Sequence, residues 1–341
     1  MRRKQESIKV ESILIIPVLV GFFLSLFFTP VWIKNAKRTG LTGRDMHKTS
    51  KEEIAEAGGV SVISGFVLGI LIYISIRTFY FNDNDGTTRE IFALLISILM
   101  VSFIGLLDDI LGWKIGLTKK TRLFFLIFAS IPLIVINAGE STMMGINFGL
   151  LYPLLLIPLG IVGASTTFNF IAGYNGLETT QGILILSALT FITWKTGSSW
   201  LSIVCLVMVL SLIAFYIFNK YPSKVFPGNI LTYSLGALIA IVAILGNIEK
   251  IAVFFFIPYI IETILKLRGG LKKESFAKID KAGFLELPYN KFYGIEHISI
   301  WLLKKLKKGK KVSEKEVVLL INLFQIGIII LGITLFRKTI F

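Results

Sequence analysis

Asp108 and Asp109 lie side by side at the end of a long apolar run, IFALLISILMVSFIGLLDDILGW. An ionised carboxylate in the middle of a bilayer costs roughly 2.5–3.5 kcal/mol, and adjacent carboxylates also repel each other. A protein retains such a pair at a membrane boundary only when a metal ion, a proton or a cationic substrate neutralises it. The acidic pair is therefore the first candidate for a functional site.

Basic side chains follow this pair in the same polar segment, at Lys119, Lys120 and Arg122. A carboxylate can bind a divalent cation, the cation can bind a diphosphate, and a lysine or arginine can bind the remaining phosphate oxygens. The segment therefore predicts a metal-bridged phosphate site. An ion pair inside the loop is the alternative, but it would not explain why two acids adjoin an apolar run.

An earlier polar segment, KRTGLTGRDMHKTSKEEIAEAGG, contains Asp45, Lys48 and Glu56 between several glycines. Gly58 and Gly59 stand at the start of the next apolar run, where a missing Cβ lets a ligand approach the backbone closely. We interpret the segment as a ligand-binding loop, with a flexible connector as the alternative.

A third segment, NFIAGYNGLETTQG, has no lysine or arginine and instead carries Asn169, Asn175, Glu178 and Gln181. Amide oxygens can ligate a hard cation or contact the edge of a nucleobase. A simple turn around the Asn-Gly dipeptide is the alternative.

Two later segments add candidates for the same site. The turn PGN ends on Asn229 at the entrance to an apolar run. The long segment KLRGGLKKESFAKIDKAGFLELPYNKFYGIEH contains Lys272 and Lys273, which could bind phosphate or sugar.

The choice of metal is narrowed by the scarcity of nitrogen and sulfur ligands. The chain has one cysteine, Cys205, inside an apolar run, and two histidines, His47 and His297. These numbers exclude a disulfide framework and a polyhistidine centre. A bound metal is therefore expected to have oxygen ligands, which favours Mg²⁺ or Mn²⁺.

The elements that position these residues are predicted to be membrane helices. Of the 341 residues, 54% are hydrophobic, and one crossing takes about 20 apolar residues. We predict an all-α integral membrane protein, one polytopic domain over residues 1–341, with about ten spans. The expected spans are 12–33, 58–80, 91–107, 122–139, 149–171, 182–195, 198–219, 230–246, 250–266 and 317–336, and the boundary at 196–199 is the weakest.

The net charge of +15 is distributed unevenly over the loops. Loops 34–57, 108–121, 172–181, 220–229 and 267–316 fall on one side and hold most of the lysines and arginines. The positive-inside rule predicts that this side is cytoplasmic, with the active-site cleft on it. Basic residues here match headgroups of anionic lipids, and a nucleic-acid partner is not expected because no soluble domain is predicted.

Four of these segments, in this order, resemble the polyprenyl-phosphate N-acetylhexosamine-1-phosphate transferases, and most of all the dolichyl-phosphate type of eukaryotes and archaea. The matching stretches are GRDMHKTSKEEIAEAGGVSVISG, GLLDDILG, NFIAGYNGLETTQG and VFPGNILTYSLGALIAIVAILGN. GFLELPYNKF is similar to the end of that family's last cytoplasmic loop. The resemblance covers about residues 37–340. Bacterial peptidoglycan-precursor relatives differ in the first loop and have a histidine-rich last loop that this chain lacks.

The resemblance implies a ten-helix enzyme that transfers N-acetylglucosamine-1-phosphate, or a related sugar-1-phosphate, from a UDP-sugar to polyprenyl or dolichyl phosphate and releases UMP. It implies a Mg²⁺ cofactor, with Mn²⁺ as a substitute, and a place early in N-glycan or cell-surface glycan assembly. The expected location is the cell membrane of an archaeon or the endoplasmic reticulum membrane of a eukaryote. The oligomeric state that we consider for this chain is a homodimer.

The resemblance also assigns roles to residues. Asp108 and Asp109 would form the acidic motif near the phosphates, and Asp109, Asn175 and Asn229 would hold the metal. The lipid phosphate would be bound by Lys119, Lys120 or Arg122, with no choice among them. The nucleotide would lie near Arg44, Asp45, Met46, Glu56 and Gln181, and the sugar diphosphate near Lys272 and Lys273. Lys48, Asn169 and Glu178 are further candidates for substrate binding.

Asn229 departs from the family pattern, which has aspartate as a magnesium ligand at this position. An amide oxygen can ligate but adds no negative charge. Either this subgroup uses an asparagine ligand, which we favour because the other motifs are intact, or the chain is a weakened or non-catalytic member that acts as a scaffold. A lipid-linked-sugar transporter is less favoured, since most charges lie in loops and no inverted repeat is apparent.

Overall fold

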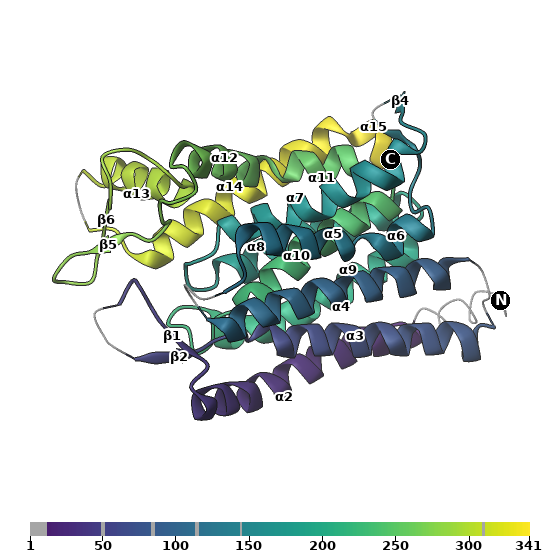
Figure 1. Ribbon diagram of the computed structural model, residues 1–341, viewed down its shortest axis with the longest axis horizontal. Helices are drawn as coiled ribbons and strands as arrows, with labels where there is room; N and C mark the ends of the chain where they lie inside the picture. Colours follow the sequence, from purple (N-terminus) through teal and green to yellow (C-terminus); the bar gives the residue numbers. More distant parts are fainter. Residues whose placement is uncertain (1–11, 49–51, 83–85, 113–115, 144, 309–310) are drawn as a thin grey trace.

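The computed structural model describes residues 12–48, 52–82, 86–112, 116–143, 145–308 and 311–341. Its long helices lie side by side in one bundle, with α10 between α4 and α7 (Figure 1). The structure confirms the predicted all-α class. Parts of three expected loops, at 49–51, 113–115 and 309–310, lie outside the described residues.

Seven helices among the described residues are long and apolar enough to cross a membrane. Each corresponds to one predicted span, because a continuous apolar run can satisfy its backbone hydrogen bonds in lipid only as a helix. They are α2 (Ile15–Thr39), α3 (Gly59–Ser75) extended by η1 (Ile76–Tyr80), α4 (Thr87–Leu111), η2 (Tyr152–Leu156) joined to α7 (Ile157–Phe170), α9 (Ser199–Asn219), α10 (Gly228–Leu245) and α14 (Glu314–Leu335).

The other three predicted spans are helical but do not meet that standard. The span at 122–139 is divided into α5 (Lys119–Phe128) and α6 (Ile131–Val135), with Pro132 at the start of the second helix. The span at 250–266 is divided at Phe256 into α11 (Glu249–Phe255) and α12 (Ile257–Arg268), with Pro258 just after the break. Proline cannot donate a backbone hydrogen bond inside a helix, so each break lies where a proline starts a new one.

The span at 182–195 is the end of a longer helix, α8 (Leu177–Lys195). Its first turn contains Glu178 and several polar residues, which makes it less apolar than the seven spans. The uncertain boundary at 196–199 is confirmed, because α8 ends at Lys195 and α9 begins at Ser199.

Three short antiparallel hairpins lie outside the bundle. The pair β1 (Thr42–Arg44) and β2 (Glu53–Ala55) forms a hairpin in the first loop. From the sequence we interpreted this loop as ligand-binding, with a flexible connector as the alternative. The pair β5 (Lys278–Ile279) and β6 (Leu285–Glu286) lies near α13 (Ile295–Leu306) in the last loop. The pair β3 (Thr142–Met143) and β4 (Ile146–Asn147) lies near the other end, beside the C-terminal α15 (Arg337–Ile340) (Figure 1).

The predicted polar loops meet at the end of the bundle that carries β1, β2, β5 and β6 (Figure 1). The amide of Phe226 donates to the carbonyl of Ala55 at 2.8 Å, which joins the first and fourth loops. The ammonium of Lys119 donates to the carbonyl of Leu271 at 3.1 Å, which joins the second and fifth. This convergence gathers the candidate site residues.

Gly105 allows α4 and α10 to cross closely just before the acidic pair. A Cβ on Gly105 would lie 2.6 Å from the carbonyl oxygen of Asn229 and from the backbone of Ile230. Small residues at such crossings let two helix backbones approach within a membrane. The crossing sets the end of α4 against the start of α10.

Candidate active site at the junction of the loops

Asp108 is buried at the end of α4 and is held by donors from three segments. Arg122 places Nη2 2.7 Å from its Oδ2, the side-chain amide of Asn229 donates to the same oxygen at 2.9 Å, and the amide of Leu117 donates to Oδ1 at 2.8 Å. The hydroxyl of Tyr233 lies 3.4 Å from Oδ2. These donors compensate the carboxylate for lost water, which a buried charge requires.

Asp109 caps the start of α10. Its Oδ1 accepts from the backbone amide of Asn229 at 2.7 Å and its Oδ2 from that of Ile230 at 3.1 Å. These amides are among the donors that a helix leaves unpaired at its N-terminus, where negative charge is favourable. Gly228 has φ +75°, and a Cβ there would clash with the Asp109 carboxylate. The turn PGN thus brings α10 onto the acidic pair.

Asn229 therefore lies against both acids, and its predicted role as a metal ligand stays a prediction. Its side-chain amide donates to Asp108, whereas a carboxylate at this position would repel that oxygen without a cation between them. A neutral asparagine therefore fits beside Asp108, whose negative charge is already paired with Arg122.

A second polar cluster surrounds Asn175, at the turn before α8. Its backbone amide donates to Oε1 of Glu314 at 2.6 Å, and its side-chain Nδ2 donates to Oδ2 of Asp45 at 2.8 Å and to Oε2 of Glu314 at 3.1 Å. Its Oδ1 is buried and has no hydrogen-bond partner among the described residues. An unpartnered buried oxygen is a place where a cation or a substrate donor can bind.

His47 belongs to this cluster. One ligand atom from each of Asp45, His47 and Glu314 lies within 4.8 Å of the others, and all three residues are buried. Nε2 of His47 accepts from the amide of Ala277 at 3.2 Å, so the neutral ring carries its proton on Nδ1. That Nδ1 lies 3.6 Å from Oε1 of Glu314, and a protonated nitrogen there cannot ligate a metal.

Arg122 has a different environment from Lys119 and Lys120, the other two residues predicted to bind the lipid phosphate. It bonds Asp108 and lies 5.6 Å from the ring centre of Tyr233, and its Nε is buried with no partner in the described part of the chain. Lys119 instead donates to a carbonyl of the last loop, and Lys120 is exposed.

The basic residues of the last loop are not joined to the acidic pair by any hydrogen bond or ion pair within the described ranges. Lys272 is exposed, and the ammonium of Lys273 lies 4.9 Å from the ring centre of Tyr289. Their predicted role at the sugar diphosphate stays a prediction.

Two polar residues of the amide-rich segment, Asn169 and Gln181, join helices, and a third, Glu178, bonds the turn before its own helix. Asn169 accepts from the Thr232 hydroxyl at 2.7 Å, which joins α7 to α10. Glu178 accepts from the amide of Gly173 at 2.8 Å. Gln181 is fully buried and bonds Asn322 and Tyr259, which joins α8 to α14 and α12. Contact with a substrate stays a prediction for all three.

The first loop has both buried and exposed predicted residues. Arg44 and Met46 are exposed, whereas Lys48 places Nζ 3.2 Å from Oδ2 of Asp45. Glu56 lies against Gly43, where a Cβ would clash with its carboxylate. Burial raises the pKa of Glu56 above its usual value.

A further buried pair, Glu296 and His297, starts α13. Burial raises the pKa of Glu296 well above its usual value, and burial together with the charge of Lys266 lowers the pKa of His297 to about 4. His297 is therefore neutral near pH 7.

Glu314 and His47 are the residues of the Asn175 cluster that the sequence analysis did not select. Glu314 fell at the end of the long loop 267–316, just before the predicted span 317–336, and two histidines were judged too few for a polyhistidine centre. The sequence signal that remained was an acid directly after Ser313, at the start of an apolar run. That signal is shared with any capped helix, so it could not single out Glu314.

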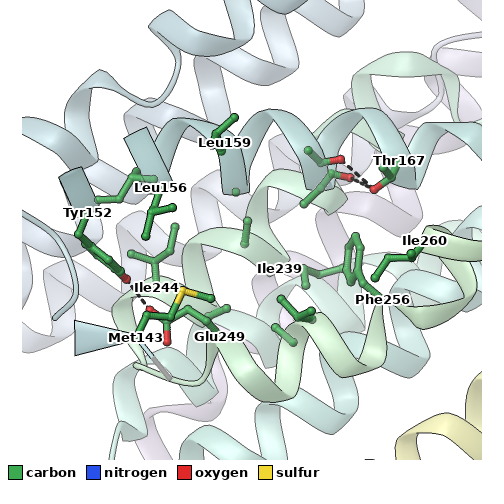
Figure 2. A pocket seen from close by; sticks show the side chains of 18 residues that line it. Met143, Tyr152, Leu156, Leu159, Thr167, Ile239, Ile244, Glu249, Phe256 and Ile260 are labelled. Carbon is green, nitrogen blue, oxygen red and sulfur yellow. Dashed lines mark hydrogen bonds between the residues drawn. The ribbon is translucent and has the colours of Figure 1, made fainter. Parts of the chain in front are cut away.

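An apolar pocket of about 290 Å³ lies beside α7, α10, α11 and α12 (Figure 2). Thr167 stands at one end, and the hydroxyl of Tyr152 donates to Glu249 at the other (Figure 2). The Thr167 end is the end of α7 that leads into the third loop, and the pocket extends from there along the membrane-spanning part of α7.

Comparison with known proteins adds the family. Residues 91–247 match the model for glycosyl transferase family 4. A provisionally named UDP-N-acetylglucosamine–dolichyl-phosphate N-acetylglucosaminephosphotransferase of Saccharolobus solfataricus is 40% identical over 282 residues, covering 80% of this chain and 83% of that protein. Its counterpart in Sulfolobus acidocaldarius is 36% identical with the same coverage.

A phospho-N-acetylmuramoyl-pentapeptide-transferase of Geobacillus is 26% identical over 306 residues, covering 86% of this chain and 92% of that protein. The two archaeal relatives are thus more similar to this chain than this bacterial one is. The chain belongs to glycosyl transferase family 4.

Proposed function

We propose that this protein transfers N-acetylglucosamine-1-phosphate from UDP-N-acetylglucosamine to a polyprenyl phosphate of the dolichyl type and releases UMP. The two archaeal relatives carry names for this reaction. The acidic pair, which bonds Arg122 and Asn229 at the junction of the polar loops, is the observation that carries the proposal.

Both reactants are anions, so the site must bring negative phosphates together and hold them in line. An oxygen of the lipid phosphate forms a bond to the β-phosphorus of the UDP-sugar. The bond from that phosphorus to the bridging oxygen breaks, and the electron pair leaves with UMP. Phosphoryl transfer depends on positioning and charge neutralisation more than on covalent work by the protein.

Arg122 is the residue we assign to the lipid phosphate. Asp108 fixes one end of its guanidinium, and its Nε has no partner among the residues described, so a donor is still free for a phosphate oxygen. Arginine binds phosphate in a directed geometry through its several N–H groups. Its place between the acid and Tyr233 sets the phosphate at the end of α4.

The apolar pocket is the part we assign to the lipid chain. It is lined almost entirely by apolar side chains of α7, α10, α11 and α12. A polyprenyl chain lying there would keep its phosphate at the Thr167 end, near the start of α10. Holding the acceptor in this way turns an encounter into a pre-oriented attack.

Magnesium is the cofactor we propose, with manganese as a substitute. The unpartnered Oδ1 of Asn175 fits a hard cation, whereas the oxygens of Asp109 already accept two backbone amides and each keeps only one further lone pair. Asn175 would hold the ion together with Asn229 and Asp109. When bound, the ion would neutralise the diphosphate and the charge that develops on UMP.

The loop end of the bundle is proposed to face the cytoplasm. The basic loops that meet there support this orientation through the positive-inside rule. A cytoplasmic site would receive UDP-sugars, which are made in that compartment, and the membrane would supply the lipid acceptor.

The decisive experiment uses the purified protein in detergent with polyprenyl phosphate, Mg²⁺ and a panel of UDP-sugars. We expect release of UMP with UDP-N-acetylglucosamine, dependent on both the lipid and the metal. Release of UMP with a different UDP-sugar alone would identify that sugar as the donor instead. No release with any donor would favour the non-catalytic reading of Asn229, and movement of a lipid-linked sugar across vesicles would favour a transporter.

A further inference from the structure

We propose that Glu314 is a positioning residue for Asn175: with Asp45, it binds the amide NH₂ group and turns the carbonyl oxygen toward the metal. The inference rests on the proposed function, because that proposal makes Asn175 a metal ligand. It adds Glu314, in the first turn of α14, to that site and gives Asp45 a positioning role there.

The geometry leaves Asn175 one orientation. Glu314 accepts the backbone amide of Asn175 at 2.6 Å and its Nδ2 at 3.1 Å, so one carboxylate binds two points of the same residue. Asp45 accepts from Nδ2 at 2.8 Å. Both protons of the side-chain amide are thus directed at carboxylates.

The chemistry of these partners excludes the flipped amide. A carboxylate accepts hydrogen bonds but cannot donate them. If the amide turned over, Oδ1 would face two anionic oxygens and repel both. The observed orientation therefore presents Oδ1 away from the acids, where it has no partner in the described part of the chain.

Two further groups lie against the acids and fix their positions. Lys48 places its ammonium 3.2 Å from Oδ2 of Asp45, and Nδ1 of His47 lies 3.6 Å from Oε1 of Glu314. Two carboxylates behind an amide also polarise its carbonyl group. Groups that orient and polarise a ligand in this way usually affect metal affinity by roughly 10–100-fold.

Direct metal binding by Asp45, His47 and Glu314 is the rival reading of the same cluster. The amide of Ala277 donates to Nε2 of His47, which places the ring proton on the nitrogen that faces the acids. The same acids are already bonded by Asn175. The cluster therefore serves Asn175 better than it serves an ion between its own members.

The test measures Mn²⁺ binding to the full-length protein in detergent, without substrate, by the electron paramagnetic resonance signal of free Mn²⁺. We expect Glu314→Gln to weaken binding roughly 10–100-fold, because the new amide can donate to Oδ1 of a flipped Asn175. Asp45→Asn should have the same effect, and it carries the test if the first variant does not fold. The Mg²⁺ concentration for half-maximal turnover should rise in parallel, with turnover largely restored at saturating Mg²⁺.

Glu316→Gln is the matched control, since Glu316 lies in the same helical turn but bonds Ser313 and Lys307 instead of Asn175. It should leave Mn²⁺ affinity unchanged. Equal affinities in wild type, Glu314→Gln and Asp45→Asn would overturn the inference, as would equal losses in Glu314→Gln and the control. A wild type whose Mn²⁺ affinity falls in Glu314→Gln but that releases no UMP with any donor would defeat the proposed function alone.

Discussion

Single side chains at the loop end divide into those that hold helices and those that face a ligand. Asn169 and Gln181 have their polar atoms engaged by other helices. Arg122 and Asn175 each keep a buried polar atom without a partner among the described residues. Since unpaired buried polar atoms are costly, the second group is where a substrate or an ion would be bound.

Asp108→Asn tests the acidic pair without removing the cap on α10. We expect turnover to fall at least about a hundredfold, because Arg122 loses the charge that orients it and the site loses charge toward the cation. UMP release measures this effect, and thermal unfolding in detergent should show that the variant still folds. Turnover near that of wild type would remove Asp108 from the mechanism.

Asn229→Asp tests the unusual residue of the fourth loop. The new carboxylate would lie beside Asp108, where Nδ2 is now 2.9 Å from the acid, so the repulsion must be relieved by a cation. We expect half-maximal turnover at a Mg²⁺ concentration on the order of tenfold lower. The variant should also melt at a lower temperature in a chelator and recover with Mg²⁺. An unchanged Mg²⁺ requirement would argue that Asn229 is not a ligand.

At the scale of elements, the site depends on how α4 meets α10. The acids come from the end of one helix, and the amides they cap come from the start of the other. Because Asp109 bonds the backbone of α10, a small displacement of either helix would separate the acidic pair from Asn229. The crossing at Gly105 is thus part of the site although it has no chemistry of its own.

Gly105→Ala tests this crossing. The new Cβ would lie 2.6 Å from backbone atoms of Asn229 and Ile230, which cannot move aside as a flexible side chain can. We expect a loss of stability of about 1–3 kcal/mol and a fall in turnover, measured by thermal unfolding and UMP release. Gly327→Ala in α14, where a Cβ meets nothing within 4 Å, is the control and should change neither. Equal behaviour of the two variants would mean that the α4–α10 contact is looser than described.

At the scale of the whole molecule, the bundle joins a polar end to an apolar interior. The loops gather acids, amides and basic residues at one end, and the pocket beside α7 extends from there along the spans. A lipid substrate has the same division, with one charged group and a long apolar chain. The shape of the molecule therefore matches an acceptor that stays in the membrane.

Gly163→Phe tests the pocket. Gly163 lines it, and a Cβ there meets nothing within 4 Å, so the larger side chain would occupy space in the pocket. We expect KM for a long polyprenyl phosphate to rise roughly tenfold, which corresponds to about two lost buried methylene groups. KM for the UDP-sugar, and for a short-chain acceptor, should be unchanged. Gly327→Phe on α14 is the control, and an equal rise in that variant would exclude a specific role for the pocket.

The sequence by itself determined the membrane class and seven of the spans, and it selected the acidic pair as the candidate site. Each of these follows from local composition, since an apolar run of sufficient length must be helical in lipid and acids beside it need compensation. It also placed Asn229 and the polar loops at one end, because alternating spans leave alternate loops on one side.

Only the tertiary structure decided which loop residues meet. The bonds from Asn175 to Glu314 join positions 139 residues apart, and those from Asn229 to Asp108 join positions 121 apart. Such contacts depend on where the helices cross and how each helix is rotated about its axis. A shift of one residue along a helix would change both. For the same reason Arg122 could not be separated from Lys119 and Lys120 in advance, and an acid in the first turn of α14 became a partner of Asn175 only once the bundle was assembled.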